Sequence, residues 1–160
     1  MADPRWLTEA EFHAWIGYRR MRARLDLQLA RDLARDSGLS APDYDVLSTV
    51  SEAAGRRMRL SELAARMLWS KSRLSHHITR MLERGLVMRE ECAEDGRGSF
   101  VELTPAGWRA IQAAAPHHVA SVREHFIDLL SSDEIGTLAA ISDKVLRHLA
   151  SSAETGPIRL

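Results

Sequence analysis

The chain has 160 residues, of which 45% are hydrophobic and 28% charged, and its 22 basic and 22 acidic side chains leave no net charge. This composition predicts one globular domain with a substantial core, and no apolar run reaches the roughly 18–20 residues of a membrane span. The N-terminus lacks the layout of a signal peptide, and the single cysteine, Cys92, excludes an intrachain disulfide. We therefore expect a cytoplasmic protein with no membrane partner.

A long first helix is predicted from Thr8 to about Asp36. Thr8 and Glu11 form a capping-box pattern at its start, and Ser37-Gly38 follows its end. Its apolar residues recur at helical spacing, namely Phe12, Trp15, Ile16, Leu25, Leu29 and Leu33. A helix of about 28 residues would span about 40 Å, which is more than the core of a small monomer needs. The excess apolar surface predicts a second copy related by a two-fold axis.

Two short helices and an extended segment are predicted next. Ser40 is a suitable cap for the second helix, with Pro42 in the first turn, where its missing N–H costs nothing. The segment 56–60 is short, basic and extended, and Leu60 is a candidate for one strand rung beside a later ribbon. A third helix is expected to be capped at Ser61-Glu62 and to end before a turn of about three residues.

The next helix, from about Lys71 to Arg84, carries the pattern that points to function. Ser70 is a suitable N-cap, and Gly85 follows as a residue that tolerates positive φ. Its apolar stripe is formed by Leu74, Ile78, Met81 and Leu82. The side chains turned away from that stripe are hydrogen-bond donors, namely Ser72, Arg73, His76, Arg80 and, more laterally, His77 and Arg84. Such a face suits the DNA major groove, where arginine can bond guanine and small hydroxyls can approach phosphate.

Positive charge concentrates around this helix. Residues 56–89 hold nine Lys or Arg and two acids, a net charge of +7 within a neutral chain. A local basic block of this kind is typical of a nucleic-acid-binding surface. A polar helix face is also often only solvated, so the helix considered alone leaves both interpretations open.

A β-hairpin is predicted after that helix, with strands near 86–89 and 99–103. Its inner contacts are expected from Phe100, Val101 and Leu103. At the tip, Arg97 lies between two glycines, which let the backbone approach a partner closely. An arginine there is suited to a narrow minor groove, and a solvent-exposed tip with an incidental arginine is the alternative.

Two further helices and a tail complete the chain. Thr104-Pro105 opens the first of these helices, and Pro116 is expected to kink or interrupt it. Ser131 and Glu134 form a second capping-box pattern, which opens the last helix. Residues 151–160 are expected to be a flexible tail.

The chain from about Thr8 to Leu149 resembles the MarR family of winged-helix transcriptional regulators. Three segments carry the resemblance, namely Leu60-Ser61-Glu62-Leu63-Ala64, Ile78 to Val87, and Asp95-Gly96-Arg97-Gly98-Ser99 through Leu103-Thr104-Pro105-Ala106-Gly107. It implies a mainly α fold with a small β-wing. The implied parts are dimerisation helices at 1–36 and 105–150, a winged helix-turn-helix DNA-binding lobe at 40–104, and the tail at 151–160.

The resemblance also implies a function. The implied protein is a sequence-specific regulator that binds a pseudo-palindromic double-stranded DNA operator as a homodimer. It would act as a repressor that a small aromatic ligand releases from DNA. The predicted DNA-binding residues are Ser70, Lys71, Ser72, Arg73, His76, His77, Arg80 and Arg97. The wing departs from the commoner Asp-Arg-Arg by having Asp-Gly-Arg, and His76 stands where many relatives carry arginine. One basic group is therefore missing at the tip, and His76 is a shorter donor whose charge depends on pH.

Other ligands and functions have weaker support in the sequence. An aromatic or phenolic effector would enter a cleft bordered by Trp15, Tyr18 and Tyr44, for each of which core packing is the alternative. No metal or other cofactor is expected, because the histidines lack ligand spacing. Redox sensing is not expected either, because Cys92 lies among glutamates that disfavour a thiolate. No catalytic motif is present, so we expect no enzyme. The remaining alternative is a winged-helix module that binds another protein without specific DNA binding.

Overall fold

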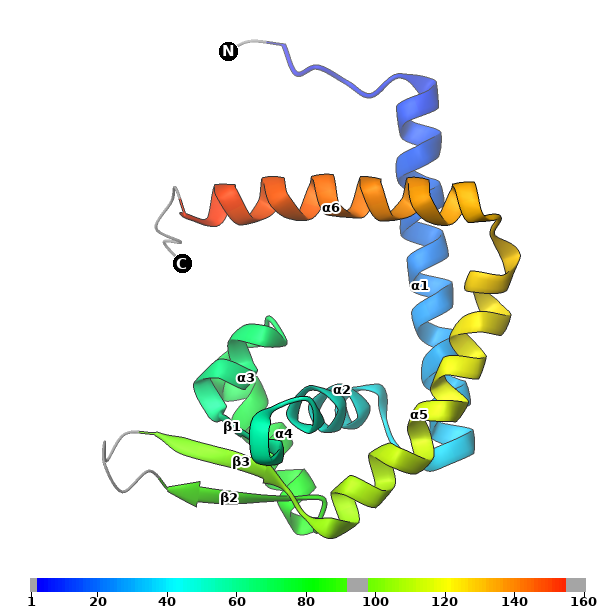
Figure 1. Cartoon of the computed structure of the whole chain (residues 1–160). Coiled ribbons are helices and arrows are strands. Elements are labelled where there is room, and N and C mark those ends of the chain that lie inside the picture. The colour runs from blue at the N-terminus through cyan, green and yellow to red at the C-terminus, as the bar shows by residue number, and fades with distance from the viewer. Residues whose placement is uncertain (1–2, 92–97, 155–160) are drawn as a thin grey trace. The chain divides into compact units, whose positions relative to one another are not determined.

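The computed structural model describes residues 3–91 and 98–154 and forms two compact units, Met1–Ser121 and Val122–Leu160 (Figure 1). The elements in chain order are α1 (Glu9–Ser37), α2 (Ala41–Ser51), the 3-10 turn η1 (Ala54–Arg56), β1 (Arg57–Arg59), α3 (Leu60–Arg66), α4 (Lys71–Glu83), β2 (Val87–Glu91), β3 (Ser99–Leu103), α5 (Pro105–His125), the 3-10 turn η2 (Ile127–Leu129) and α6 (Ser132–Glu154). The predicted class, mainly α with a small β-wing, is confirmed. No helix within the described ranges has the length and apolar character needed to cross a membrane.

Local capping sets the starts of α1 and α6, as predicted. The Thr8 hydroxyl accepts a hydrogen bond from the Glu11 N–H at 3.3 Å, and the Glu11 carboxylate accepts one from the Thr8 N–H at 2.8 Å. Ser131 and Glu134 repeat this arrangement before α6. Gly38 ends α1 at φ 69°, where its missing Cβ removes the steric penalty of the left-handed conformation. α6 continues to Glu154, so the first four residues of the predicted tail are helical.

The three-stranded sheet has the order β1-β3-β2, and both pairs are antiparallel. β1 pairs with β3 from Arg57 to Arg59, and Leu60 is already the first residue of α3. The proposed strand rung at Leu60 and the cap at Ser61 are therefore wrong. Pairing with β3 holds the chain extended up to Arg59, which becomes the N-cap position without a side-chain capping bond.

Successive residues of β3 point to opposite faces of the sheet. Ser99, Val101 and Leu103 are buried, whereas Phe100 and Glu102 are partly exposed. Phe100 is therefore not an inner contact, contrary to the prediction. Its ring lies 4.0 Å from the guanidinium of Arg57, a contact across the β1–β3 pair that covers the outer face of the sheet.

The core of the first unit joins α2, α3 and α4 to the inner face of this sheet. Its largest fully buried side chains are Leu47, Leu63, Leu74, Ile78, Met81, Val46, Val50 and Val101. α5 continues through Pro116 instead of stopping there, because Ile111 and Ala114 before the proline and Ser121 after it are all buried. Ser121 also donates a hydrogen bond to Asp32 of α1 at 2.8 Å, which ties α5 to the first helix.

Candidate nucleic-acid interface

α3, the turn that follows it and α4 form a helix-turn-helix (Figure 1). The second helix has one buried face and one exposed face. The Ser70 hydroxyl accepts a hydrogen bond from the Arg73 N–H at 3.2 Å and starts α4 as predicted. One face is buried, with Leu74, Ile78 and Met81 fully enclosed. The other face is solvent-exposed and carries Ser70, Lys71, Ser72, Arg73, His76, Thr79 and Arg80. Except for His77, the predicted contacts on α4 therefore lie together on one accessible surface.

Arg73 is held near the start of α4 by an aromatic side chain. Its guanidinium lies 4.0 Å from the ring centroid of Trp69, which belongs to the turn before the helix. The Trp69 ring in turn meets the His77 ring edge-on at 5.6 Å. Trp69 is thus half-buried against α4 and supports the exposed arginine.

His77 was predicted to face solvent, and this is wrong. Its side chain is only 8% exposed, and its Nε2 lies 3.2 Å from Oδ1 of the buried Asp43 on α2. The other Asp43 oxygen accepts a hydrogen bond from Arg84 at 2.7 Å. His77 stands at the edge of the apolar stripe of α4, and Asp43 of α2 covers that edge, so the His77 side chain is not part of the exposed face of α4.

The pKa values of Asp43 and His77 are both shifted from their usual values. Burial would raise the pKa of the Asp43 carboxyl, but hydrogen bonds from Arg84 and Ser40 outweigh it and hold that pKa below its usual value. Burial lowers the pKa of His77. The Asp43 carboxylate opposes this shift, and the nearby cations Arg80 and Arg84 reinforce it. At neutral pH the site therefore holds an ionised carboxylate next to a neutral imidazole.

We expect acid to destabilise the fold through His77. Its pKa is lower in the folded state than in the unfolded chain, so the unfolded chain takes up a proton first as the pH falls below about 6.5. The His77 contribution to stability is complete above that pH and is lost below it, at up to about 1.4 kcal/mol per pH unit. Chemical unfolding at pH 7.5, 6.5 and 5.5 should show a steeper decline for the native chain than for His77→Gln. Equal declines would contradict the prediction.

The wing contributes further basic residues, some of which are paired. Arg57 on β1 forms an ion pair with Glu90 on β2 at 2.7 Å, and Arg89 donates a hydrogen bond to the Ser99 hydroxyl at 2.9 Å. These contacts connect the strands of the sheet. Arg97, predicted to enter the minor groove, and the neighbouring Cys92 lie outside the described residues.

The aromatic residues predicted for an effector site fall into two groups. Tyr44 lines a cleft of about 250 Å³ beside α2, together with Asp45, Ser48, Thr49, Arg66, Met67 and Trp69. Its ring also packs 4.4 Å from that of His118, and burial raises the pKa of its phenol. Trp15 and Tyr18 instead line a depression of about 340 Å³ on α1. Neither of these two pockets contains residues of both groups.

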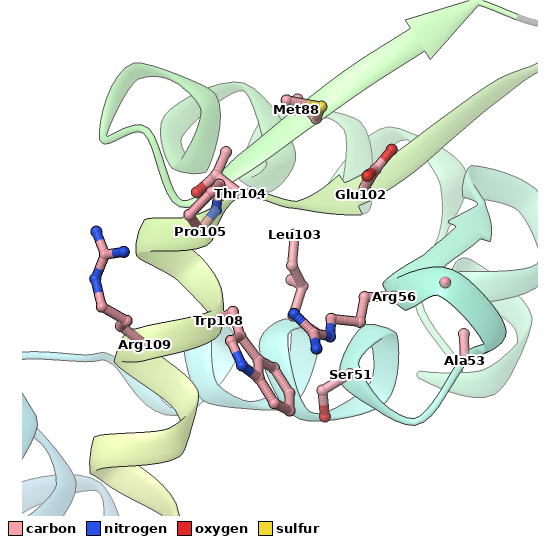
Figure 2. A pocket seen from close by; sticks show the side chains of 11 residues that line it. Ser51, Ala53, Arg56, Met88, Glu102, Leu103, Thr104, Pro105, Trp108 and Arg109 are labelled. Carbon is pink, nitrogen blue, oxygen red and sulfur yellow. The ribbon is translucent and has the colours of Figure 1, made fainter.

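A groove at the base of the wing was not among the predictions from the sequence. Figure 2 shows the Arg56 guanidinium beside the indole of Trp108, and the distance to the ring centroid is 3.8 Å. The groove measures about 650 Å³ and is lined by Ser51, Ala53, Gly55, Arg56, Met88, Glu102, Leu103, Thr104, Pro105, Trp108 and Arg109. Its lining comes from α2, η1, β2, β3, α5 and their connections, so no local pattern could indicate it.

The exposed side of α4 is suited to the recognition of an anionic partner. Within residues 3–91 and 98–154, no group of three or more His, Cys, Asp or Glu side chains is placed to hold a metal ion. The exposed side of α4 offers hydroxyl, imidazole, ammonium and guanidinium donors with its single acid, Glu83, at the last helical position. Such a surface is complementary to phosphates and base edges.

Comparison with known proteins places this arrangement among DNA-binding regulators. The MarR family model matches residues 37–98. AbsC from Streptomyces coelicolor, a MarR family transcriptional regulator, is 44% identical, with 92% of this chain and 99% of AbsC covered and a TM-score of 0.88. Sco3205 from the same organism, a MarR family regulator solved in complex with DNA, is 37% identical, with 92% of each chain covered and a TM-score of 0.88. The transcriptional regulator HosA from Escherichia coli is 37% identical over 97 residues, which cover 60% of this chain and 69% of HosA.

Proposed function

Because this chain belongs to the MarR family of transcriptional regulators, we propose that it binds a pseudo-palindromic double-stranded DNA operator as a homodimer. The proteins that identify the family are regulators and not enzymes. The observation that carries the proposal is the exposed face of α4, where seven donor-bearing side chains lie over a fully buried apolar face. A recognition helix needs this division, because one side must hold the helix rigidly while the other enters the major groove.

The proposed contacts follow from position along α4. Ser70, Lys71 and Ser72 lie at its N-terminal end, where hydroxyls, backbone N–H groups and a cation are suited to phosphate. Arg73 is the next residue and His76 lies about one turn further on, where side chains can reach base edges, and Arg80 extends the same face. We also propose Arg97 as a minor-groove contact, because the sequence places it between two glycines at the predicted wing tip.

The homodimer is proposed from apolar surface that each unit leaves exposed. On α1 this surface includes Phe12, Trp15, Tyr18 and Met21, and on α6 it includes Ile135, Ile141, Val145, Leu146 and Leu149. The stripe on α6 recurs at helical spacing. Contiguous apolar faces of this kind are costly in water, and a second copy would cover them. A two-fold dimer would also present two α4 helices to an inverted repeat.

We further propose that the regulator is a repressor released by a small aromatic or phenolic ligand. The cleft at Tyr44 supports this, since it combines two aromatic rings with the Arg66 guanidinium, which would have to exchange its exposed ion pair with Glu62, at 2.9 Å, for a ligand carboxylate. Trp15 and Tyr18 remain alternative contacts on α1. Titration of the DNA complex with benzoate and salicylate derivatives tests the proposal, with Tyr44→Ala as the variant expected to lose the response.

Selection of bound duplexes from a random pool at fixed salt tests DNA binding directly. The expected result is an inverted repeat with half-sites about one helical turn apart. Affinity for that repeat should fall with salt, with a log–log slope of about −0.9 for each phosphate contacted. A protein-interaction module would recover no repeat, and that outcome would overturn the proposal.

Arg73→Ala should weaken binding to the selected duplex by about 1–3 kcal/mol, because a bidentate arginine–base contact has that magnitude. Arg22→Ala is the matched control, since Arg22 is an exposed arginine on α1 that pairs with Asp26. Both variants should melt within a few degrees of the native chain. If the affinities of Arg73→Ala and Arg22→Ala are equal in fluorescence anisotropy, Arg73 is not a DNA contact.

A further inference from the structure

A chain of three polar side chains connects the interior of the first unit to the exposed face of α4. It begins at Asp43 on α2, which is 2% exposed, passes through the buried His77 and ends at the exposed Arg80. His77 Nε2 lies 3.2 Å from Asp43 Oδ1, and Arg80 NH2 lies 3.0 Å from His77 Nδ1. The two ring nitrogens therefore face groups of opposite charge.

This geometry decides which nitrogen of His77 carries the proton. A guanidinium can only donate hydrogen bonds, so Nδ1 must offer its lone pair to Arg80. The single proton of the neutral imidazole then lies on Nε2, the ring nitrogen that is 3.2 Å from Asp43 Oδ1. A proton on Nδ1 would face the Arg80 cation and leave Arg80 without this acceptor.

The surroundings hold the imidazole in this orientation. Asp43 is itself fixed by Arg84 at 2.7 Å and by the Ser40 N–H at 3.0 Å. Trp69 packs against the ring edge-on from the preceding turn. The charged groups that face His77 are thus Asp43 from α2 and Arg80 and Arg84 from α4. None of these interactions depends on the second unit.

We propose that His77, oriented by Asp43, is a positioning residue that orders the Arg80 guanidinium on the DNA-facing side of α4. The proposal rests on the proposed function, in which Arg80 touches DNA. The contact uses one terminal nitrogen of Arg80 and leaves Nε and NH1 to point elsewhere. Because the rotamer is restricted before DNA arrives, less side-chain freedom is lost on binding. A buried histidine thereby contributes to DNA affinity without touching DNA.

A double-mutant cycle on the selected duplex tests this coupling. Arg80→Ala should weaken binding, and His77→Phe, which keeps a ring but removes the acceptor, should weaken it roughly threefold to tenfold. In the Arg80→Ala background, His77→Phe should cause no further loss. His76→Phe is the control, because His76 is exposed on the same helix, and its effect should add to that of Arg80→Ala.

The outcomes separate the two proposals. If the native chain selects no inverted repeat, the proposed function fails. If the native chain binds and Arg80→Ala weakens it, but His77→Phe is harmless or has an additive effect, only the positioning role is overturned. An unchanged affinity for Arg80→Ala alongside a weakened Arg73→Ala also overturns the positioning role, while DNA binding stands.

A second measurement needs no variant and so does not depend on whether His77→Phe folds. Nitrogen-15 NMR of the imidazole in the native protein at pH 7.5 reports which ring nitrogen is protonated. We expect His77 to carry its proton on Nε2 and an unprotonated, hydrogen-bonded Nδ1. A proton on Nδ1 would overturn the proposal, since Arg80 could not then donate to it.

Discussion

Gly107→Ala is expected to destabilise the fold by at least about 3 kcal/mol. A Cβ at this position would lie 1.9 Å from the Leu86 carbonyl oxygen and 2.9 Å from its carbon. Both atoms belong to the backbone, so no side-chain rotation relieves the clash. The first turn of α5 would have to move away from the chain segment that joins α4 to β2, and the Leu47 side chain, at 3.4 Å, limits movement on the other side.

The neighbouring hydrogen bonds explain why this close approach exists. The Thr104 hydroxyl lies 2.6 Å from the Gly85 carbonyl and 3.1 Å from that of Leu86, and it accepts a hydrogen bond from the Gly107 N–H at 3.0 Å. Thr104 thus holds the start of α5 against the end of α4, and only glycine fits at the point of contact. Moving α5 would break these bonds as well.

Gly136→Ala is the matched control for this prediction. Gly136 lies within α6, and no atom comes within 4 Å of a Cβ built there. Alanine at that position should be neutral or should stabilise the helix by up to about 1 kcal/mol. Guanidinium unfolding at protein concentrations above the range of dimer dissociation compares both variants with the native chain. A Gly107→Ala protein as stable as Gly136→Ala would show that the backbone contact yields easily.

Leu146→Glu is expected to abolish the proposed homodimer. Leu146 is 64% exposed in the single chain and lies in the apolar stripe of α6. In a two-fold interface the substitution places a carboxylate on both copies, and each copy also loses the burial of a leucine, which is worth about 1.5–3 kcal/mol. The dimer dissociation constant should therefore rise by at least about a thousandfold, which corresponds to about 4 kcal/mol.

Lys144→Glu is the control, because Lys144 lies on the opposite side of α6 from the apolar stripe and also receives a negative charge. Sedimentation velocity should show a dimer for the native chain and Lys144→Glu, and a monomer for Leu146→Glu. The monomeric variant should also bind the inverted repeat far more weakly, since its two half-sites would be bound independently. A native chain that sediments as a monomer at micromolar concentration would contradict the dimer and its operator symmetry.

On α4, the sequence was sufficient to predict most of the buried and exposed residues, but not the burial of His77. Periodicity alone placed Leu74, Ile78 and Met81 in the core and Arg73 and His76 on the exposed face, and the structure confirms both. His77 was assigned to the solvent-exposed face because helical periodicity gives the direction in which a side chain points, but not whether another element packs against it. Asp43, which lies 34 positions earlier in the chain and on another helix, packs against His77. The residue predicted to contact DNA is therefore buried.

Sequence by itself determined the features that depend on neighbours within four residues. The caps at Thr8, Ser40, Ser70 and Ser131, the stop at Gly38 and the apolar stripes of the helices are of this kind, because the hydrogen bonds and angles involved close within one helical turn. The tertiary structure alone decided which edge of a stripe is covered, that Leu60 starts a helix, that Phe100 faces outward beneath Arg57, and that Gly107 meets a backbone carbonyl. Each of these depends on a segment distant in the chain, whose approach no local pattern encodes.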